Sequence, residues 1–319
     1  IIYNLFMINL RHIKFLGIVI FSLLLFSQSF ADKKFDKDLK ILSKFNSFIN
    51  NKGESYATDV KFDKDKTIIV IYAHGQLTDR REKCTKKWNK VPPAIYQLDG
   101  ITINNLTVRI YHLCYGIGRS WTEKEQDYFW EVYDKNNQDP KSILNLKNKK
   151  GELLLNKNEI WRRTKAMKLK VDEFVAKGFN NIVLSGISAG AWTSLVLKSD
   201  FPDLIDGVVG FAPARSGKYA KKKNPHKGWV NWRNYKMSLI KTDKLDKVLV
   251  YAHEKDAFEN TKTLSFLSDS KTVKFIDLSD TKCKGKVMLG GYHGITLTKC
   301  FANEDPRSME IAKYLEEIF

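Results

Sequence analysis

The stretch LSGISAGAW, Leu184 to Trp192, decides the fold. It follows the apolar run Ile182 to Leu184, which predicts a buried strand, and small residues at 186, 188 and 190 give the pattern Gly-x-Ser-x-Gly. In that pattern a serine stands on a sharp turn between a strand and a helix, where its hydroxyl is exposed for nucleophilic attack. A tight turn of a nucleotide-binding fold is the alternative, but the Gly-x-Gly-x-x-Gly spacing is absent here and no P-loop lysine follows. We therefore predict that Ser188 is a nucleophile.

Short β-branched runs alternate with helical patterns along the chain. The expected strands are Thr67–Tyr72, Thr107–Leu113, Asn181–Leu184, Gly207–Phe211, Lys247–Tyr251 and Val273–Leu278. The expected helices are Asn158–Lys177, Ala189–Lys198, Ala257–Leu267 and Pro306–Phe319. Strands that are apolar almost throughout are typical of a parallel sheet covered on both faces. The pattern predicts an α/β fold with a mostly parallel central sheet and helices on both of its faces.

Two segments, about 115–156 and 214–239, fit neither pattern. Both are polar or basic, contain scattered aromatic residues, and follow expected strand ends, where insertions over an active site are tolerated. We expect them to be lid-like insertions; the alternative is that they are excursions with small apolar clusters of their own.

The N-terminus has a different character. Arg11 and Lys14 precede the apolar run Phe15–Phe26, and Ser29 and Ala31 stand at the small-residue positions of a cleavage site. The run is shorter than the roughly 20 residues of a membrane-spanning helix. The pattern predicts a cleaved signal peptide over 1–31, one domain with the α/β fold over 32–319, and a secreted or periplasmic protein; an uncleaved anchor is the alternative.

The four cysteines suit an oxidising compartment. They allow three connectivities, and their placement as two local pairs favours Cys84–Cys114 and Cys283–Cys300. No Cys-x-x-Cys spacing occurs, so we predict no metal site.

Lysine and arginine number 54 against 36 acidic residues, a formal net charge of +18. This balance predicts at most a weak attraction to anionic membrane or polysaccharide surfaces. The basic residues are scattered over the whole chain, and their densest cluster, Lys218 to Lys227, is interrupted by Pro225. A solvated basic face is therefore favoured over a specific polyanion site, and no nucleic-acid partner is predicted.

A serine nucleophile needs a base that accepts its proton and a carboxylate that orients the base. Both types of residue follow expected strands in the second half of the chain. The segment AHEKDAFEN places Asp256 after the strand Lys247–Tyr251, and LGGYHGIT places His293 in a loop ahead of the C-terminal helix. We predict the triad Ser188, Asp256 and His293.

Other residues compete for the two partner roles. The competing histidines are His74, His112, His226 and His253, and the competing acids are Asp206, Glu254 and Glu259.

The elements YAHGQL, GISAG, GFAPA, AHEKD and GYHGI occur in the order found in secreted members of the α/β-hydrolase superfamily. From Thr67 to Phe319 the chain resembles the dienelactone hydrolase or carboxylesterase branch of that superfamily. The resemblance implies that Ser188 is the nucleophile, His293 the general base and Asp256 the orienting acid. It also implies a small-molecule ester substrate and no cofactor.

An acyl-transfer enzyme also needs donors for the oxyanion that forms during the reaction. The backbone N–H of Ala189, at the start of the helix after the serine, is one expected donor. The other is expected in the His-Gly-Gln element, at the N–H of Gln76, with that of Leu77 as the alternative.

Three functions remain open at this point. The first is an exported serine esterase that works through an acyl-enzyme, with a Cys283–Cys300 bridge restraining the loop that carries His293. The second is a peptidase or amidase of the same superfamily. The third is a non-catalytic basic binding module, because a fold alone does not determine a function.

Overall fold

The computed structural model describes residues 33–56, 60–75, 90–115, 123–151, 153–157, 159–216, 228–283, 291–304 and 306–319. The chain divides into two compact units, 1–40 and 41–319. Of the first unit, the structure describes the start of helix α2 (Lys33–Leu42), and the expected signal peptide over 1–31 lies outside the described residues. Among the helices in these ranges, none combines the length and the apolar character needed to cross a membrane.

The second unit is built on a mixed sheet of nine strands in its described part. The strand order is β2-β1-β5-β3-β6-β7-β8-β9, and β4 pairs with β5 beside this path. Neighbours from β5 to β9 along this order are parallel, whereas β1, β2 and β4 pair antiparallel at one side. The strands are β1 (Ser47–Ile49), β2 (Ser55–Tyr56), β3 (Thr67–Ala73), β4 (Thr102–Ile103), β5 (Leu106–Leu113), β6 (Asn181–Ile187), β7 (Gly207–Phe211), β8 (Val248–Ala252) and β9 (Val273–Asp277). The predicted parallel α/β architecture is confirmed.

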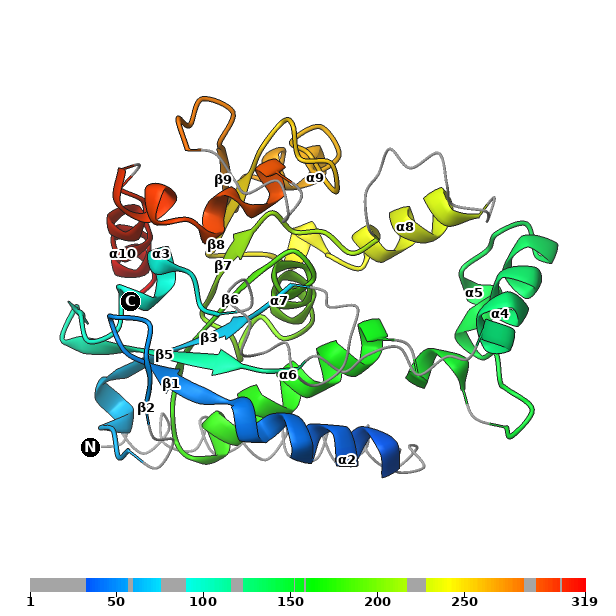
Figure 1. Ribbon diagram of the computed structural model, residues 1–319, viewed down its shortest axis with the longest axis horizontal. Coiled ribbons are helices and arrows are strands. Elements are labelled where there is room, and N and C mark those ends of the chain that lie inside the picture. Colours follow the sequence, from blue (N-terminus) through cyan, green and yellow to red (C-terminus); the bar gives the residue numbers. More distant parts are fainter. Residues whose placement is uncertain are drawn as a thin grey trace, which may run out of the picture. The chain divides into compact units, whose positions relative to one another are not determined.

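Helices and short turns connect the strands (Figure 1). The helices of this unit are α3 (Pro93–Tyr96), α4 (Glu123–Lys135), α5 (Lys141–Leu144), α6 (Glu159–Ala176), α7 (Ala189–Asp200), α8 (Trp229–Ser238), α9 (Ser265–Ser268) and α10 (Arg307–Ile318). Short 3₁₀ helices are η1 (Ser43–Phe45), η2 (Lys64–Lys66), η4 (Leu154–Lys157), η5 (Thr242–Lys244) and η7 (Gly291–Leu297), and η8 (Cys300–Glu304) is a short π-helix.

Strand β7 shows how helices cover both faces of the sheet. A Cβ at Gly210 would meet the Cβ of Ala191 on α7 at 3.6 Å. The next residue, Phe211, belongs to the core cluster that contains Ile311 and Leu315 of α10. Successive strand residues point to opposite faces, so α7 covers one face of β7 and α10 covers the other. Burial of these apolar side chains removes them from water and stabilises the layers at roughly 25 cal/mol per Å².

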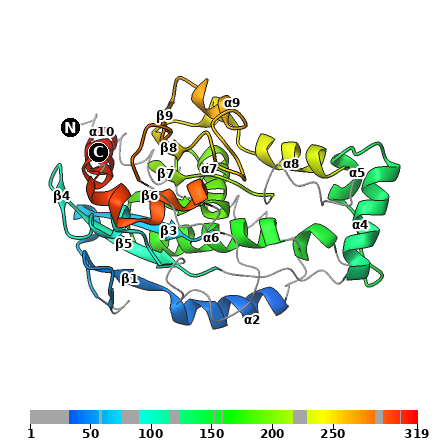
Figure 2. The same cartoon turned by 45° about the horizontal axis from the view of Figure 1, so that its top comes forward.

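The two aromatic-rich segments pack against each other. Residues of α4, α5, η4 and α8 form one buried cluster, namely Phe129, Trp130, Tyr133, Ile143, Leu154, Leu155 and Trp232. Both views show α4 and α5 side by side, with α8 between them and the sheet (Figures 1 and 2). Of the two expectations for these segments, the described parts show the excursions with an apolar cluster of their own; covering of the site by a lid stays a prediction.

One expected helix is wrong. Over Ala257–Leu267 the structure has turns, with helix α9 only from Ser265 to Ser268. The Oδ1 of Asp256 accepts the N–H of Phe258 at 2.8 Å, and the Oδ1 of Asn260 accepts the N–H of Thr263 at 2.9 Å. Such local side-chain bonds offer the backbone an alternative to helical hydrogen bonds.

Candidate active site

Ser188 lies on a strained turn between β6 and α7. Its backbone has φ 56° and ψ −119°, a conformation that L-residues rarely adopt. Neighbouring backbone holds it there: its N–H donates to Phe211 O at 2.9 Å, and its carbonyl accepts the N–H groups of Trp192 at 2.9 Å and Ala214 at 3.2 Å. Strain of this kind persists only where surrounding structure enforces it, and it is common at functional sites.

The two flanking glycines are required by the closeness of β3. A Cβ at Gly190 would stand 2.1 Å from the carbonyl oxygen of Ala73, and one at Gly186 would stand 2.6 Å from the same oxygen. The small residues in the Gly-x-Ser-x-Gly pattern therefore let the helix that follows Ser188 approach the backbone of the neighbouring strand.

The predicted acid and the serine follow strands of the same parallel set, so both lie at its carboxyl edge. Backbone bonds continue across that edge: Ala212 N–H donates to Tyr251 O at 2.8 Å, and Leu278 N–H donates to Ala252 O at 2.7 Å. Only β7 lies between β6, which leads to Ser188, and β8, which leads to Asp256.

Asp256 and His293 form a buried pair. The Nδ1–H of His293 donates to the Oδ2 of Asp256 at 2.7 Å, and the Oδ1 of Asp256 accepts the N–H of Phe258. The Phe258 ring lies on the imidazole with 4.3 Å between centroids. A carboxylate only accepts hydrogen bonds, so Nδ1 is the donor in this pair, and in the neutral imidazole Nε2 has the lone pair that a general base needs.

The serine and the imidazole are not hydrogen-bonded. Between the described residues Ser188 and His293 no such bond is present. In free enzymes these catalytic bonds are commonly long and tighten when substrate binds, so the meeting of the two groups stays a prediction.

The competing acids have other partners or positions. The carboxylate of Asp206 accepts the N–H of Ile182 at 2.7 Å, at the amino end of the parallel strands. Glu259 is paired with Arg233, and Glu254 is exposed. Asp256 is thus the acid that the structure brings to His293.

Three competing histidines also have local roles. The Nδ1–H of His74 donates to Gly75 O at 2.7 Å, His112 is buried within β5, and the Nδ1 of His253 accepts the N–H of Lys255 at 2.9 Å. His226 lies outside the described residues.

The loop after β3 lies beside the nucleophile. A Cβ at Gly75 would stand 3.2 Å from the Cβ of Ser188. The Gly75 carbonyl accepts two hydrogen bonds, from His74 Nδ1 and from the Nη1 of Arg163 at 3.0 Å. Burial lowers the pKa of His74 well below its ordinary value, and the charge of Arg163 lowers it further. His74 is therefore neutral. Gln76, the predicted oxyanion donor, and Leu77, its alternative, lie outside the described residues.

The Cys283–Cys300 disulfide is confirmed, and it encloses His293 in a loop with a sequence separation of 17. The other predicted pairing, Cys84–Cys114, involves a residue outside the described ranges and stays a prediction. Within those ranges no group of three or more His, Cys, Asp or Glu side chains is arranged to hold a metal ion.

Sequence reasoning missed several residues around the site. Arg163 on α6 and Arg233 on α8 are buried, although both are arginines in polar-looking helical segments. Phe258 lies in the segment 257–264, where the helix expected from the sequence does not form. No local pattern marks them, because each acts through a contact with a residue distant in sequence.

A parallel sheet, a strained serine turn after a central strand, and an acid–imidazole pair after later strands together define an α/β-hydrolase fold. No family model matches the chain, and no curated protein matches it. Among solved structures, one from work on the metagenome-derived lipolytic enzymes LipS and LipT is similar to this chain, at 9% identity and a TM-score of 0.44. The match covers 78% of this chain and 94% of that chain.

Two further solved structures are similar at the same level. Est1E from Butyrivibrio proteoclasticus has 14% identity and a TM-score of 0.43, with 79% of this chain and 89% of that chain covered. A prolyl endopeptidase structure has 12% identity and a TM-score of 0.44, with 86% of this chain and 38% of that chain covered. The fold assignment rests on the strand order and the serine turn of this chain itself.

Proposed function

We propose that the protein is an exported serine hydrolase that cleaves small carboxylic esters through an acyl-enzyme. The observation that carries the proposal is the buried hydrogen bond from His293 to Asp256, at the sheet edge where Ser188 stands on a strained turn. Export is proposed from the signal-peptide pattern over 1–31.

In the proposed reaction, His293 Nε2 takes the proton of the Ser188 hydroxyl as the serine oxygen attacks the ester carbonyl. The imidazolium is stabilised by Asp256 and then gives its proton to the departing alcohol. Water, activated by the same imidazole, releases the acid and restores the serine.

The proposed oxyanion donors are the backbone N–H groups of Ala189 and Gln76. Amides in the first turn of a helix have no acceptor within the helix, which supports Ala189. For Gln76 the support is the preceding carbonyl, that of Gly75, which is hydrogen-bonded by His74 and Arg163. In a planar trans peptide the N–H points away from the carbonyl, so an anchored Gly75 carbonyl would direct the following amide to the opposite side.

The test is covalent labelling of the purified protein with a fluorophosphonate probe, together with turnover of a short nitrophenyl ester. Ser188→Ala should abolish both without unfolding the protein. Ser194→Ala is the matched control, because the Ser194 hydroxyl only donates within α7, to Gly190 O at 3.0 Å, and its loss should leave labelling intact. Labelling that survives Ser188→Ala, or a wild-type protein that is not labelled, would contradict the proposal. Comparing esters with aminoacyl amides then separates an esterase from an amidase.

A further inference from the structure

Helix α8 contacts two elements of the proposed active site. In the last turn of α8, the carbonyl of Lys236 accepts the indole Nε1–H of Trp192 at 2.9 Å. Trp192 lies one turn after Ser188 on α7. The helix that carries the nucleophile is therefore hydrogen-bonded to α8.

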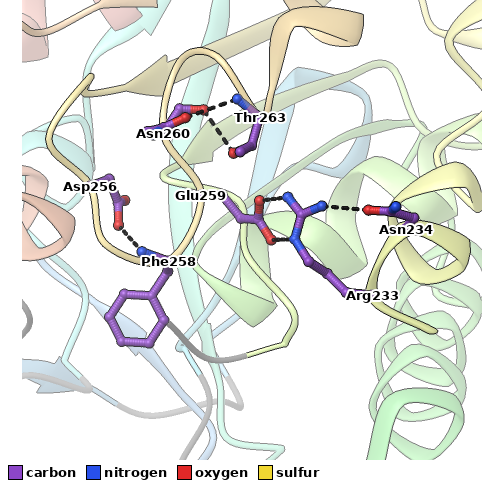
Figure 3. A network of polar contacts seen from close by, with 7 residues as sticks. All are labelled: Arg233, Asn234, Asp256, Phe258, Glu259, Asn260 and Thr263. Atoms are coloured by element: carbon purple, nitrogen blue, oxygen red, sulfur yellow. Dashed lines mark hydrogen bonds and ion pairs between the residues drawn. The ribbon is translucent and has the colours of Figure 1, made fainter. Parts of the chain in front are cut away.

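About one turn earlier, at Arg233, α8 reaches the loop that carries the acid. The guanidinium of Arg233 forms a bidentate pair with the carboxylate of Glu259, with its Nε at 2.9 Å from Oε1 and its Nη2 bonded to Oε2 (Figure 3). The remaining Nη1 donates to the Oδ1 of Asn234 at 2.7 Å. A planar fork of donors on a carboxylate fixes the direction of both groups.

Glu259 belongs to the same tight loop as the proposed acid. Asp256 lies three residues earlier, and Phe258, which bonds the Asp256 carboxylate and covers the His293 ring, is the residue directly before Glu259 (Figure 3). A displacement of Glu259 would move Phe258 and, through it, the orientation of both the carboxylate and the imidazole.

The pair is buried, which makes each partner depend on the other. Glu259 is 0% exposed and Arg233 5% exposed. Burial raises the pKa of Glu259, while the Arg233 guanidinium opposes that rise. Removing one partner leaves an uncompensated buried charge, whereas replacing both by neutral groups is much less costly.

We propose that Arg233 and Glu259 are positioning residues, and that α8 is a brace that holds the acid loop and the nucleophile helix in mutual alignment. The proposal rests on the proposed function, since it concerns the alignment of the same three side chains. Helix α8 is itself packed against the aromatic cluster of α4, α5 and η4, where the centroid of the Trp232 ring lies 5.3 Å from that of Phe129 on α4. The two insertions thus support the reacting groups of the sheet.

The first test is kinetic. Glu259→Gln and Arg233→Gln should each lower kcat by roughly 10- to 100-fold with KM nearly unchanged, as expected for a small misplacement of reacting groups. The double variant should recover most of that loss, because no unpaired charge remains. Asp99→Asn is the matched control: Asp99 pairs with Arg109 of β5 at 3.5 Å, remote from the acid loop in the sequence, so its loss should affect stability and leave kcat unchanged.

The second test follows the imidazole directly. The downfield proton resonance of His293 Nδ1 should be present in the wild type and absent in Asp256→Asn. It should be shifted or lost in each single variant, and restored in the double variant. Arg233→Lys serves if Arg233→Gln does not fold, because lysine keeps the charge without the bidentate fork and should give an intermediate loss.

Single variants that unfold at lower temperature but keep the wild-type kcat and resonance would overturn the brace. If the wild-type protein is labelled and active in that case, only the positioning role of Arg233 and Glu259 is rejected, and the proposed function is retained. A protein that is never labelled, yet whose resonance responds to Glu259→Gln and recovers in the double variant, would instead reject the hydrolase and keep the brace.

Discussion

Replacing Asp256 by Asn tests the proposed chemistry with almost no change in shape. The carboxylate accepts two hydrogen bonds, one from Phe258 N–H and one from His293 Nδ1. An asparagine side chain keeps one acceptor oxygen and has an NH₂ donor group in place of the other. The Phe258 amide can only donate, so the acceptor oxygen stays there and the NH₂ group faces the imidazole.

The consequence is a change of tautomer. Facing a donor, Nδ1 of His293 becomes the acceptor, and the proton moves to Nε2, where it blocks removal of the serine proton. In a serine hydrolase whose carboxylate is changed in this way, kcat falls by about 10⁴-fold, which corresponds to about 5.5 kcal/mol of transition-state stabilisation. We expect a loss of this order for Asp256→Asn.

The assay is steady-state turnover of a nitrophenyl ester at saturation, with active sites counted by fluorophosphonate titration of the wild type. Asp206→Asn is the control, since Asp206 lies at the amino end of the strands and bonds Ile182 N–H. It should retain wild-type kcat. A variant at Asp256 that keeps more than about a tenth of the wild-type kcat would refute the tautomer argument and Asp256 as the orienting acid.

Two further predictions concern stability. Replacing both Cys283 and Cys300 by Ser should cost roughly 3 kcal/mol in urea unfolding, from chain entropy at a sequence separation of 17, and a loss below about 1 kcal/mol would contradict the estimate. Burial lowers the pKa of His74 in the folded state, so below about pH 6.5 the unfolded state binds a proton that the folded state does not. The free energy of unfolding should therefore be highest above that pH and should decrease below it by up to about 1.4 kcal/mol per pH unit. Thermal unfolding of His74→Gln from about pH 7.5 to about pH 5 should show a shallower decrease than the wild type; an equal slope would mean that His74 is protonated in the fold.

The sequence was most informative where a strand is buried on both faces. Continuous apolar runs located β3, β7 and β8 to within a residue at each end, because burial on both faces leaves no alternation to misread. The partly buried strands β5 and β9 were located equally closely from their β-branched and aromatic residues. Strand β6 continues three residues beyond its apolar run, through Ser185 and Gly186, whose small size serves the turn. The short strands β1, β2 and β4 were not predicted, since two or three residues give too little pattern.

Chain order and loop composition pointed to Asp256 and His293, and the structure joins them. The same reasoning placed Phe258 and Glu259 on a helix, because their own propensities compete with side-chain bonds made by Asp256 and Asn260. Arg233 was equally hidden: its burial depends on a partner 26 residues away.

The positive φ of Ser188 creates a trade-off between thermal stability and turnover at a single position. Glycine would adopt that backbone shape without penalty, so a laboratory selection for thermal endurance alone would favour losing the hydroxyl. Screens for a more thermostable variant of this protein therefore need to measure turnover from the first round, because otherwise they will select stable variants that have no activity.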